Sequence, residues 1–144
     1  MAEFISIGSQ NLNPGSPIAL IDSIPCPKGY VIHRNGSGIL TLRGIVNNPC
    51  GKFARFLIEY SGNIAIPTGG TVGEISVGLA VTGEIEQGTV AKVTPAAVEQ
   101  FFNVSAARYI TVPMGCCINV ALENASDIPI IADEQFNIVV TRTA

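Results

Sequence analysis

Charged residues are scarce in this sequence. They make up 13% of its 144 residues, whereas a typical soluble domain carries about 25%. The eight Lys and Arg residues are scattered singly and the net charge is −3, so no basic stripe is available to a nucleic-acid backbone. Hydrophobic residues nevertheless reach 47%. This balance indicates that part of the surface is covered by sister subunits, because monomers rarely expose large apolar patches.

The sequence also lacks the features of secreted and membrane-inserted chains. It starts Met-Ala-Glu-Phe-Ile-Ser, without the basic segment of a secretion signal, and the apolar run from Ile18 to Ile21 is too short for the signal's hydrophobic part. No run approaches the length of a membrane span. We therefore expect synthesis in a bacterial cytoplasm without a signal peptide, and no insertion into a membrane.

Four cysteines, at positions 26, 50, 116 and 117, lack the C-x-x-C spacing of common zinc sites. Together with His33 they supply suitable ligand types, but their spacing does not favour a metal. Without a secretion signal we expect a reducing compartment, in which the thiols stay reduced and mostly buried. The sequence predicts no metal, no cofactor and no disulfide framework.

Histidine is almost absent, which limits the catalytic options. His33 is the only one, so any Ser-His or Cys-His pair must use it. Its position within a predicted hairpin favours a surface histidine or a hydrogen-bonded strand histidine. The loop 69–73 is rich in glycine but lacks the Gly-Lys of a phosphate-binding loop. We expect no enzyme and assign no catalytic residue.

What the sequence does contain is a regular series of short apolar runs separated by Gly, Pro, Asn and Ser. Residues 1–16 have no sustained period and are predicted to form an extended N-terminal arm, while residues 17–144 form one domain. The spacing of the runs is typical of a sandwich or barrel. The predicted strands are Ile18–Ile24, Tyr30–His33, Ile39–Leu42, Phe53–Ile66, Glu74–Thr82, Thr89–Val93, Arg108–Val112, Cys116–Glu123 and Phe136–Thr141.

Several turns follow from local chemistry. Asn35-Gly36 lies between two apolar runs and predicts a hairpin from residue 30 to residue 42. Further turns are expected at 82–84 and at 113–115. Residues 94–102 fit a helical turn that begins at Thr94-Pro95 and a bulged strand equally well, so both remain open.

Two strands have consecutive apolar residues on both faces. Ile138, Val139 and Val140 follow one another, and Phe56, Leu57 and Ile58 lie between Arg55 and Glu59. Because strand side chains alternate between two faces, one face can enter the core and the other needs a second dry environment. A subunit interface would supply it, and we predict that Phe56, Tyr60, Ile138 and Val140 pack at or beside such a contact.

The order of these features resembles the tumour-necrosis-factor-like (TNF-like) jelly roll, including complement-type globular heads and their bacterial and phage relatives. The segments that carry the resemblance are a long central strand, a strand with a short return, a hairpin, and an apolar strand close to the carboxyl terminus. The first three are 53–60, 75–88 and 110–124. The resemblance implies an all-β, antiparallel jelly-roll sandwich of two sheets and a tight threefold homotrimer.

The resemblance also implies a role in assembly. The chain has no collagen-like stalk, transmembrane anchor or secretion signal, which leaves the family's use in particles. We therefore expect a non-enzymatic protein on a virion surface, a head fibre or capsid decoration, anchored to a larger particle such as a capsid through its N-terminal arm. The alternative is a carbohydrate- or protein-binding module that uses loops 47–52 and 62–73 to bind a host-surface glycan or protein.

Overall fold

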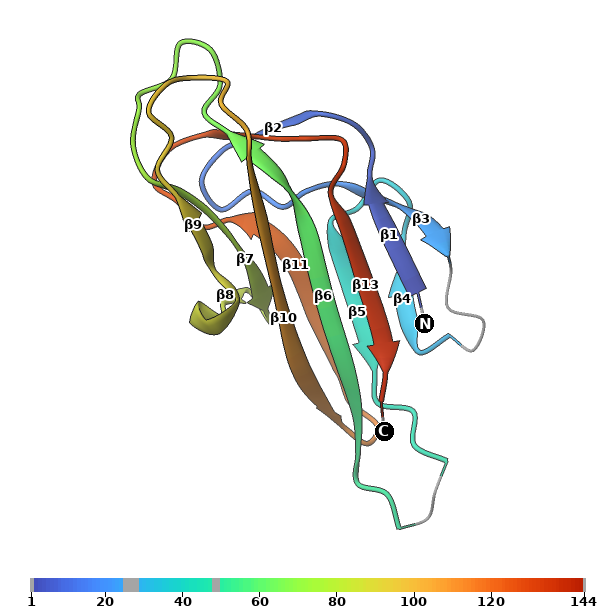
Figure 1. The fold of residues 1–144 in the computed structure, drawn as a ribbon. Coiled ribbons are helices and arrows are strands. Elements are labelled where there is room, and N and C mark those ends of the chain that lie inside the picture. The colour runs from blue at the N-terminus through green and yellow to red at the C-terminus, as the bar shows by residue number, and fades with distance from the viewer. Residues whose placement is uncertain (1, 25–28, 48–49, 144) are drawn as a thin grey trace.

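The computed structural model describes residues 2–24, 29–47 and 50–143, which form two antiparallel β-sheets packed face to face (Figure 1). The larger sheet contains β1 (Ala2–Ser6), β2 (Gln10–Leu12), β3 (Leu20–Ile24), β6 (Phe53–Ala65), β10 (Phe102–Pro113), β12 (Ile130–Ala132) and β13 (Asn137–Arg142). The smaller sheet contains β4 (Val31–His33), β5 (Ile39–Arg43), β7 (Ile75–Val81), β8 (Glu84–Ile85), β9 (Ala91–Val93) and β11 (Cys117–Asn124). A 3-10 turn, η1 (Gln87–Thr89), lies between β8 and β9. The predicted two-sheet jelly roll is confirmed.

β6 is the central strand of the larger sheet. It pairs along its length with β10, from Phe53 opposite Pro113 to Ile64 opposite Phe102. Its other edge pairs first with β13 and then with β12. The chain's last long strand therefore lies between β6 and β1, and the two ends of the described sequence are neighbours in one sheet.

The core lies between the sheets and follows the period-two alternation of the strands. From Ala54 to Ile64 in β6, and at Ile138 and Val140 in β13, the even-numbered residues point inward and are buried, while the odd-numbered residues between them point outward. The largest fully buried side chains include Phe4, Phe56 and Phe136. Gly62 has no side chain because a Cβ there would lie 2.3 Å from Cγ of Phe136, whose ring occupies that space.

The predicted turns are present where local chemistry is strong. β4 and β5 form the expected hairpin, with Val31 opposite Leu42, and Gly36 in its turn has a φ of +91°. Thr82 and Gly83 connect β7 to β8 with φ values of 55° and 88°. Consecutive left-handed residues match the right-handed twist of the paired strands, which accounts for the tight reversal.

Residues 94–101 form neither of the two elements that the sequence left open. They are an irregular connection with bends and turns, and strand β10 begins at Phe102. β10 is therefore much longer than the predicted strand 108–112. Its added residues pair with the end of β6, a contact between segments about 40 positions apart that local periodicity does not show.

The structure corrects the predicted N-terminal arm. β1 pairs with β13 and β3, and β2 pairs with β12, so residues 2–12 belong to the larger sheet. Ala2, Phe4, Ser6 and Leu12 are buried. The arm was predicted because these strands are short and two of their partners lie at the other end of the chain, where no local pattern reveals them.

The segment 110–124 is also not a hairpin. β10 belongs to the larger sheet and β11 to the smaller one, so the turn at 113–115 carries the chain across the sandwich. Gly115 supplies the positive φ, 78°, that this corner requires. None of the described residues forms a helix long and apolar enough to cross a membrane.

Candidate functional site

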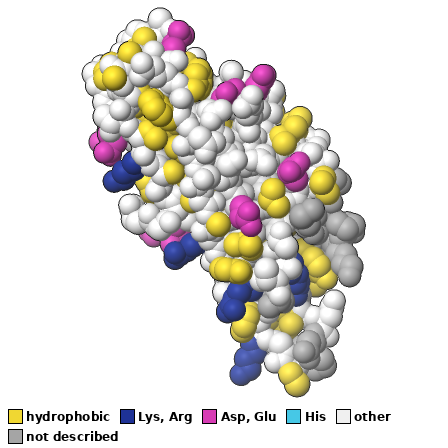
Figure 2. Space-filling view, in the orientation of Figure 1, with side chains coloured by type: hydrophobic (Ala, Val, Ile, Leu, Met, Phe, Trp, Pro, Cys, Tyr) yellow, Lys and Arg dark blue, Asp and Glu magenta, His cyan; other side chains and the backbone are white. Residues whose placement is uncertain are grey.

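The outer face of the larger sheet is the first candidate surface. On it, register places Tyr109 beside Leu57, and places Ala107 beside Glu59, whose other neighbour is Val139. Tyr109 is 60% exposed, and Leu57 and Val139 are half-buried. Figure 2 views the molecule from the side on which Figure 1 draws these strands, and shows hydrophobic side chains dispersed over this face among few charged ones.

Hydroxyl and amide groups continue this face above the apolar rows. Ser105 lies opposite Ser61, which lies opposite Asn137 on β13. Together with Glu59 and Val139 these residues line a shallow hollow of about 370 Å³. The face thus combines apolar side chains, small polar groups and a carboxylate.

The four residues predicted to lie at a trimer contact lie elsewhere. Phe56, Tyr60, Ile138 and Val140 are at most 2% exposed within a single chain, where they form the core between the sheets. The argument that these strands have a second apolar face still applies. The residues predicted for that face were the even-numbered ones, however, and these point inward. The outward members of the same strands are the residues between them, including Leu57 and Val139.

A signal for the correct parity was present in the sequence. Arg55 and Glu59 flank the apolar run of β6 and are both odd-numbered. Since an unpaired charge is costly to bury, the odd-numbered face had to be the outward one. Leu57 shares that face, and the antiparallel register with β13 then places Val139 on it as well.

Tyr60 connects the two sheets through its hydroxyl group. The hydroxyl donates a hydrogen bond to the carbonyl oxygen of Thr89 and lies 3.4 Å from that of Val77. Burial raises the pKa of Tyr60 to about 12 because the ionised form would lose its hydration. Thr89 in turn accepts from Leu79 N at 3.0 Å and donates to the Glu86 carbonyl at 2.7 Å, so the phenol holds η1 in place.

His33 is a structural histidine. Its Nδ1 lies 2.5 Å from Oδ1 of Asp22, and its Nε2 lies 2.8 Å from the carbonyl oxygen of Ser37. The side chain is 1% exposed, and its ring meets that of Phe4 edge-on with centroids 4.9 Å apart. Both nitrogens are already bonded, so the ring has no nitrogen available for a nucleophile or a metal.

The described cysteines are exposed, which corrects the expectation that most would be buried. Cys116 and Cys117 are exposed free thiols at the start of β11, and Cys50 is exposed in the loop that precedes β6. Cys26 lies outside the described residues. Within residues 2–24, 29–47 and 50–143, no group of three or more His, Cys, Asp or Glu side chains is arranged to hold a metal ion.

The two loops proposed for ligand binding lie at opposite ends of the sandwich. One precedes Phe53 at the start of β6 and the other follows Ala65 at its end (Figure 1). Residues 48–49 of the first loop lie outside the described residues, and residues 62–65 of the second are part of β6 itself. The two loops of one chain therefore cannot form one site.

Comparison with known proteins finds structural similarity without sequence similarity. No protein-family model matches the sequence, and no curated protein matches it. The structure of Eiger TNF from S. frugiperda aligns with a TM-score of 0.66 at 11% identity, covering 99% of this chain and 91% of that one. The EclA C-terminal domain, a sugar-binding protein, aligns with a TM-score of 0.41 at 14% identity, covering 91% and 76%. The chain has a TNF-like jelly-roll fold.

Proposed function

We propose that this chain is a non-enzymatic structural protein, a homotrimeric jelly roll that decorates the surface of a phage virion or a similar large particle. The observation that carries the proposal is the outer face of the larger sheet, where Tyr109, Leu57, Ala107 and Val139 form an apolar strip across three strands that Glu59 interrupts. An obligate interface of this kind resembles a domain core cut in half. It would also account for the low content of charged residues.

The edge of the same sheet supports assembly. β10 is 12 residues long and pairs only with β6 among the described strands, so its second edge has no ladder partner. A long strand edge can pair with other chains unless it is covered. Tyr109 on this strand is 60% exposed. In the proposed trimer, a neighbouring copy covers the edge of β10 and the Tyr109 side chain.

Charged groups on the outer face can pair between copies. Glu59 and Glu3 lie on either side of Val139 on neighbouring strands. Arg55 is the next outward-facing residue before Leu57 along β6. Carboxylates and a guanidinium on the same self-associating surface can form ion pairs across it. These contacts would select the register of association, while the apolar strip supplies most of its free energy.

Attachment to a particle requires a surface other than a free arm, since residues 2–12 lie in the larger sheet. The two ends of the sandwich offer exposed hydrophobic side chains. Phe101 and Phe102 lie near the end of β6, and Met114 and Phe53 lie at its start. We assign attachment to one of these ends, which remain accessible when the outer face of the larger sheet is covered.

Mass spectrometry of purified particles from the producing culture, combined with electron microscopy using an antibody against this chain, tests the decoration role. The proposal expects the chain to co-purify with particles and to label their surface. Absence from the particles, with the chain found only in the soluble fraction of the cells, contradicts it.

A further inference from the structure

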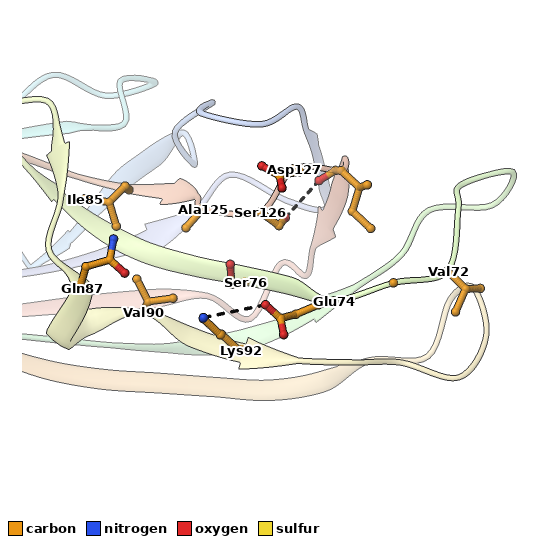
Figure 3. A pocket seen from close by; sticks show the side chains of 12 residues that line it. Val72, Glu74, Ser76, Ile85, Gln87, Val90, Lys92, Ala125, Ser126 and Asp127 are labelled. Atoms are coloured by element: carbon orange, nitrogen blue, oxygen red, sulfur yellow. Dashed lines mark hydrogen bonds and ion pairs between the residues drawn. The ribbon is translucent and has the colours of Figure 1, made fainter.

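A second hollow lies on the opposite side of the molecule, on the outer face of the smaller sheet. It has a volume of about 430 Å³ and is formed by three segments that are distant in the sequence: 72–76, 85–92 and 125–128 (Figure 3). Its volume is within the range of small-molecule sites. The outer face of the larger sheet does not contribute to it, so the proposed trimer contact and this hollow are separate surfaces.

Ser76 of β7 forms the floor of the hollow. Gly78 is the next outward residue of this strand, and β8 and β9 pair beside β7 in the same sheet. A Cβ on Gly78 would lie 3.0 Å from Cγ2 of Val90 and 3.2 Å from Cγ2 of Ile85. The absence of a side chain at Gly78 therefore allows Val90 and Ile85 to form an apolar wall.

The opposite wall is held rigidly by Asn124. Its amide nitrogen donates to the carbonyl oxygens of Leu12 at 3.1 Å and of Ile128 at 2.9 Å, and its Oδ1 accepts from Ser126 N at 2.9 Å. Asn124 is 1% exposed. The loop 125–128 is thus fixed before any ligand arrives, which lowers the entropy cost of binding.

The floor presents a hydroxyl group to the hollow. Ser76 is 4% exposed and lines the hollow, and no described residue forms a hydrogen bond with its side chain. Figure 3 shows this hydroxyl projecting from β7 into the space between Gln87 and Ser126. Its Oγ atom reaches the surface of the hollow, so water or a ligand can form a hydrogen bond with it.

The rim supplies further polar groups and little net charge. Glu74 and Lys92 face each other at 3.9 Å as an exposed ion pair, and Asp127 adds a second carboxylate. Two carboxylates against one ammonium group disfavour an anionic ligand. Gln87 contributes an amide that can both donate and accept hydrogen bonds.

From these groups we infer that the hollow binds a neutral saccharide of one or two pyranose rings. Ser76, Gln87 and Asp127 offer donors and acceptors suited to the ring hydroxyls, while Val90 and Ile85 offer an apolar surface to the C–H face of the ring. No aromatic side chain is part of the described lining, so the hydrogen bonds must supply most of the selectivity. This inference is independent of trimer formation and of attachment to a particle.

Saturation-transfer-difference NMR on the full chain tests the inference with the methyl glycosides of glucose, galactose, mannose, fucose and N-acetylglucosamine, and with glucuronate as an anionic probe. At least one neutral glycoside should receive saturation and be displaced by its free sugar, while glucuronate should receive less. If no neutral glycoside receives saturation, or if glucuronate is the strongest probe, the inference is wrong.

Variants locate the site. Ser76→Ala removes the floor hydroxyl and should weaken the best glycoside roughly tenfold, the effect of losing one buried hydrogen bond. Ser23→Ala is the matched control, because Ser23 is an exposed serine in β3 on the other sheet. Binding that survives Ser76→Ala unchanged, or that Ser23→Ala reduces equally, overturns the assignment.

Gln87→Ala provides a second test that does not touch the buried floor. Gln87 is exposed, so its loss leaves folding intact, and it should weaken the same glycoside. Unchanged binding in both Ser76→Ala and Gln87→Ala places any sugar elsewhere on the protein. Light scattering on each variant reports the oligomeric state separately, so a failure of the saccharide site and a failure of the assembly proposal give different results.

Discussion

At the scale of single residues, Tyr60 joins the two sheets through one hydrogen bond. Tyr60→Phe keeps the ring in the core but leaves the buried carbonyl of Thr89 without its donor. An unsatisfied buried acceptor costs about 1–3 kcal/mol. We therefore expect a loss of that size in the free energy of unfolding, measured by urea denaturation at neutral pH. An unchanged midpoint would show that the contact contributes nothing to stability.

The same residue predicts alkaline sensitivity. In the folded chain the pKa of Tyr60 is about 12, whereas the unperturbed value is 10.0. Between these values the unfolded chain has lost the proton and the folded chain retains it, so stability present below pH 10 falls as the pH rises towards 12. Urea titrations over this range should show a smaller fall for Tyr60→Phe than for the unmodified chain. Parallel falls in both proteins would exclude Tyr60 as the cause.

His33 makes a comparable contribution at the edge of the sandwich. Its Nδ1 lies 2.5 Å from the Asp22 carboxylate and its Nε2 lies 2.8 Å from the Ser37 carbonyl oxygen. His33→Ala removes these bonds and the ring that packs on Phe4. A loss of about 2–4 kcal/mol in unfolding free energy is expected, since cavity formation adds to the lost hydrogen bonds. Thermal unfolding of this variant at neutral pH measures it, and a melting temperature equal to that of the unmodified chain would contradict it.

At the scale of elements, strand existence was predictable and strand environment was not. Each of the nine predicted strands is present, because β-branched runs between turn residues are a local signal. The short return after β7 is β8, as predicted, but the short strands β1, β2 and β12 were missed, since three to five residues carry too little periodicity. The hollow on the smaller sheet was also beyond prediction, because its walls come from three segments that only the fold brings together.

Parity within β13 gives a direct test of the corrected orientation. Val140 is 1% exposed and points into the core, whereas Val139 points outward. Val140→Asp buries a carboxylate that has no partner, at a cost of several kcal/mol, which is a large part of the stability of a typical domain. Val139→Asp should keep the fold. Circular dichroism should show that Val140→Asp is unfolded and that Val139→Asp is folded. The reverse result would show that Val140 is the outward residue, as the sequence predicted.

At the scale of the whole molecule, association should control stability. If the folded chain forms a trimer through the outer face of the larger sheet, mass action makes the melting temperature rise with protein concentration. A chain that is folded and monomeric has a melting temperature independent of concentration. Calorimetry over a wide concentration range separates the two cases before any variant is made.

The final prediction identifies the surface that associates. Val139→Asp places a carboxylate next to Glu59 and within the apolar strip, where burial against a neighbouring copy would cost several kcal/mol. Asn119→Asp is its matched control, because it adds the same charge to a strand on the outer face of the smaller sheet and keeps the oxygen that accepts the Thr41 hydroxyl. Light scattering should give a trimer mass for the unmodified chain and for Asn119→Asp, and a monomer mass for Val139→Asp. A monomer for the unmodified chain ends the trimer proposal, and a trimer that persists in Val139→Asp moves the contact away from this face, because a buried carboxylate at its centre could not be tolerated.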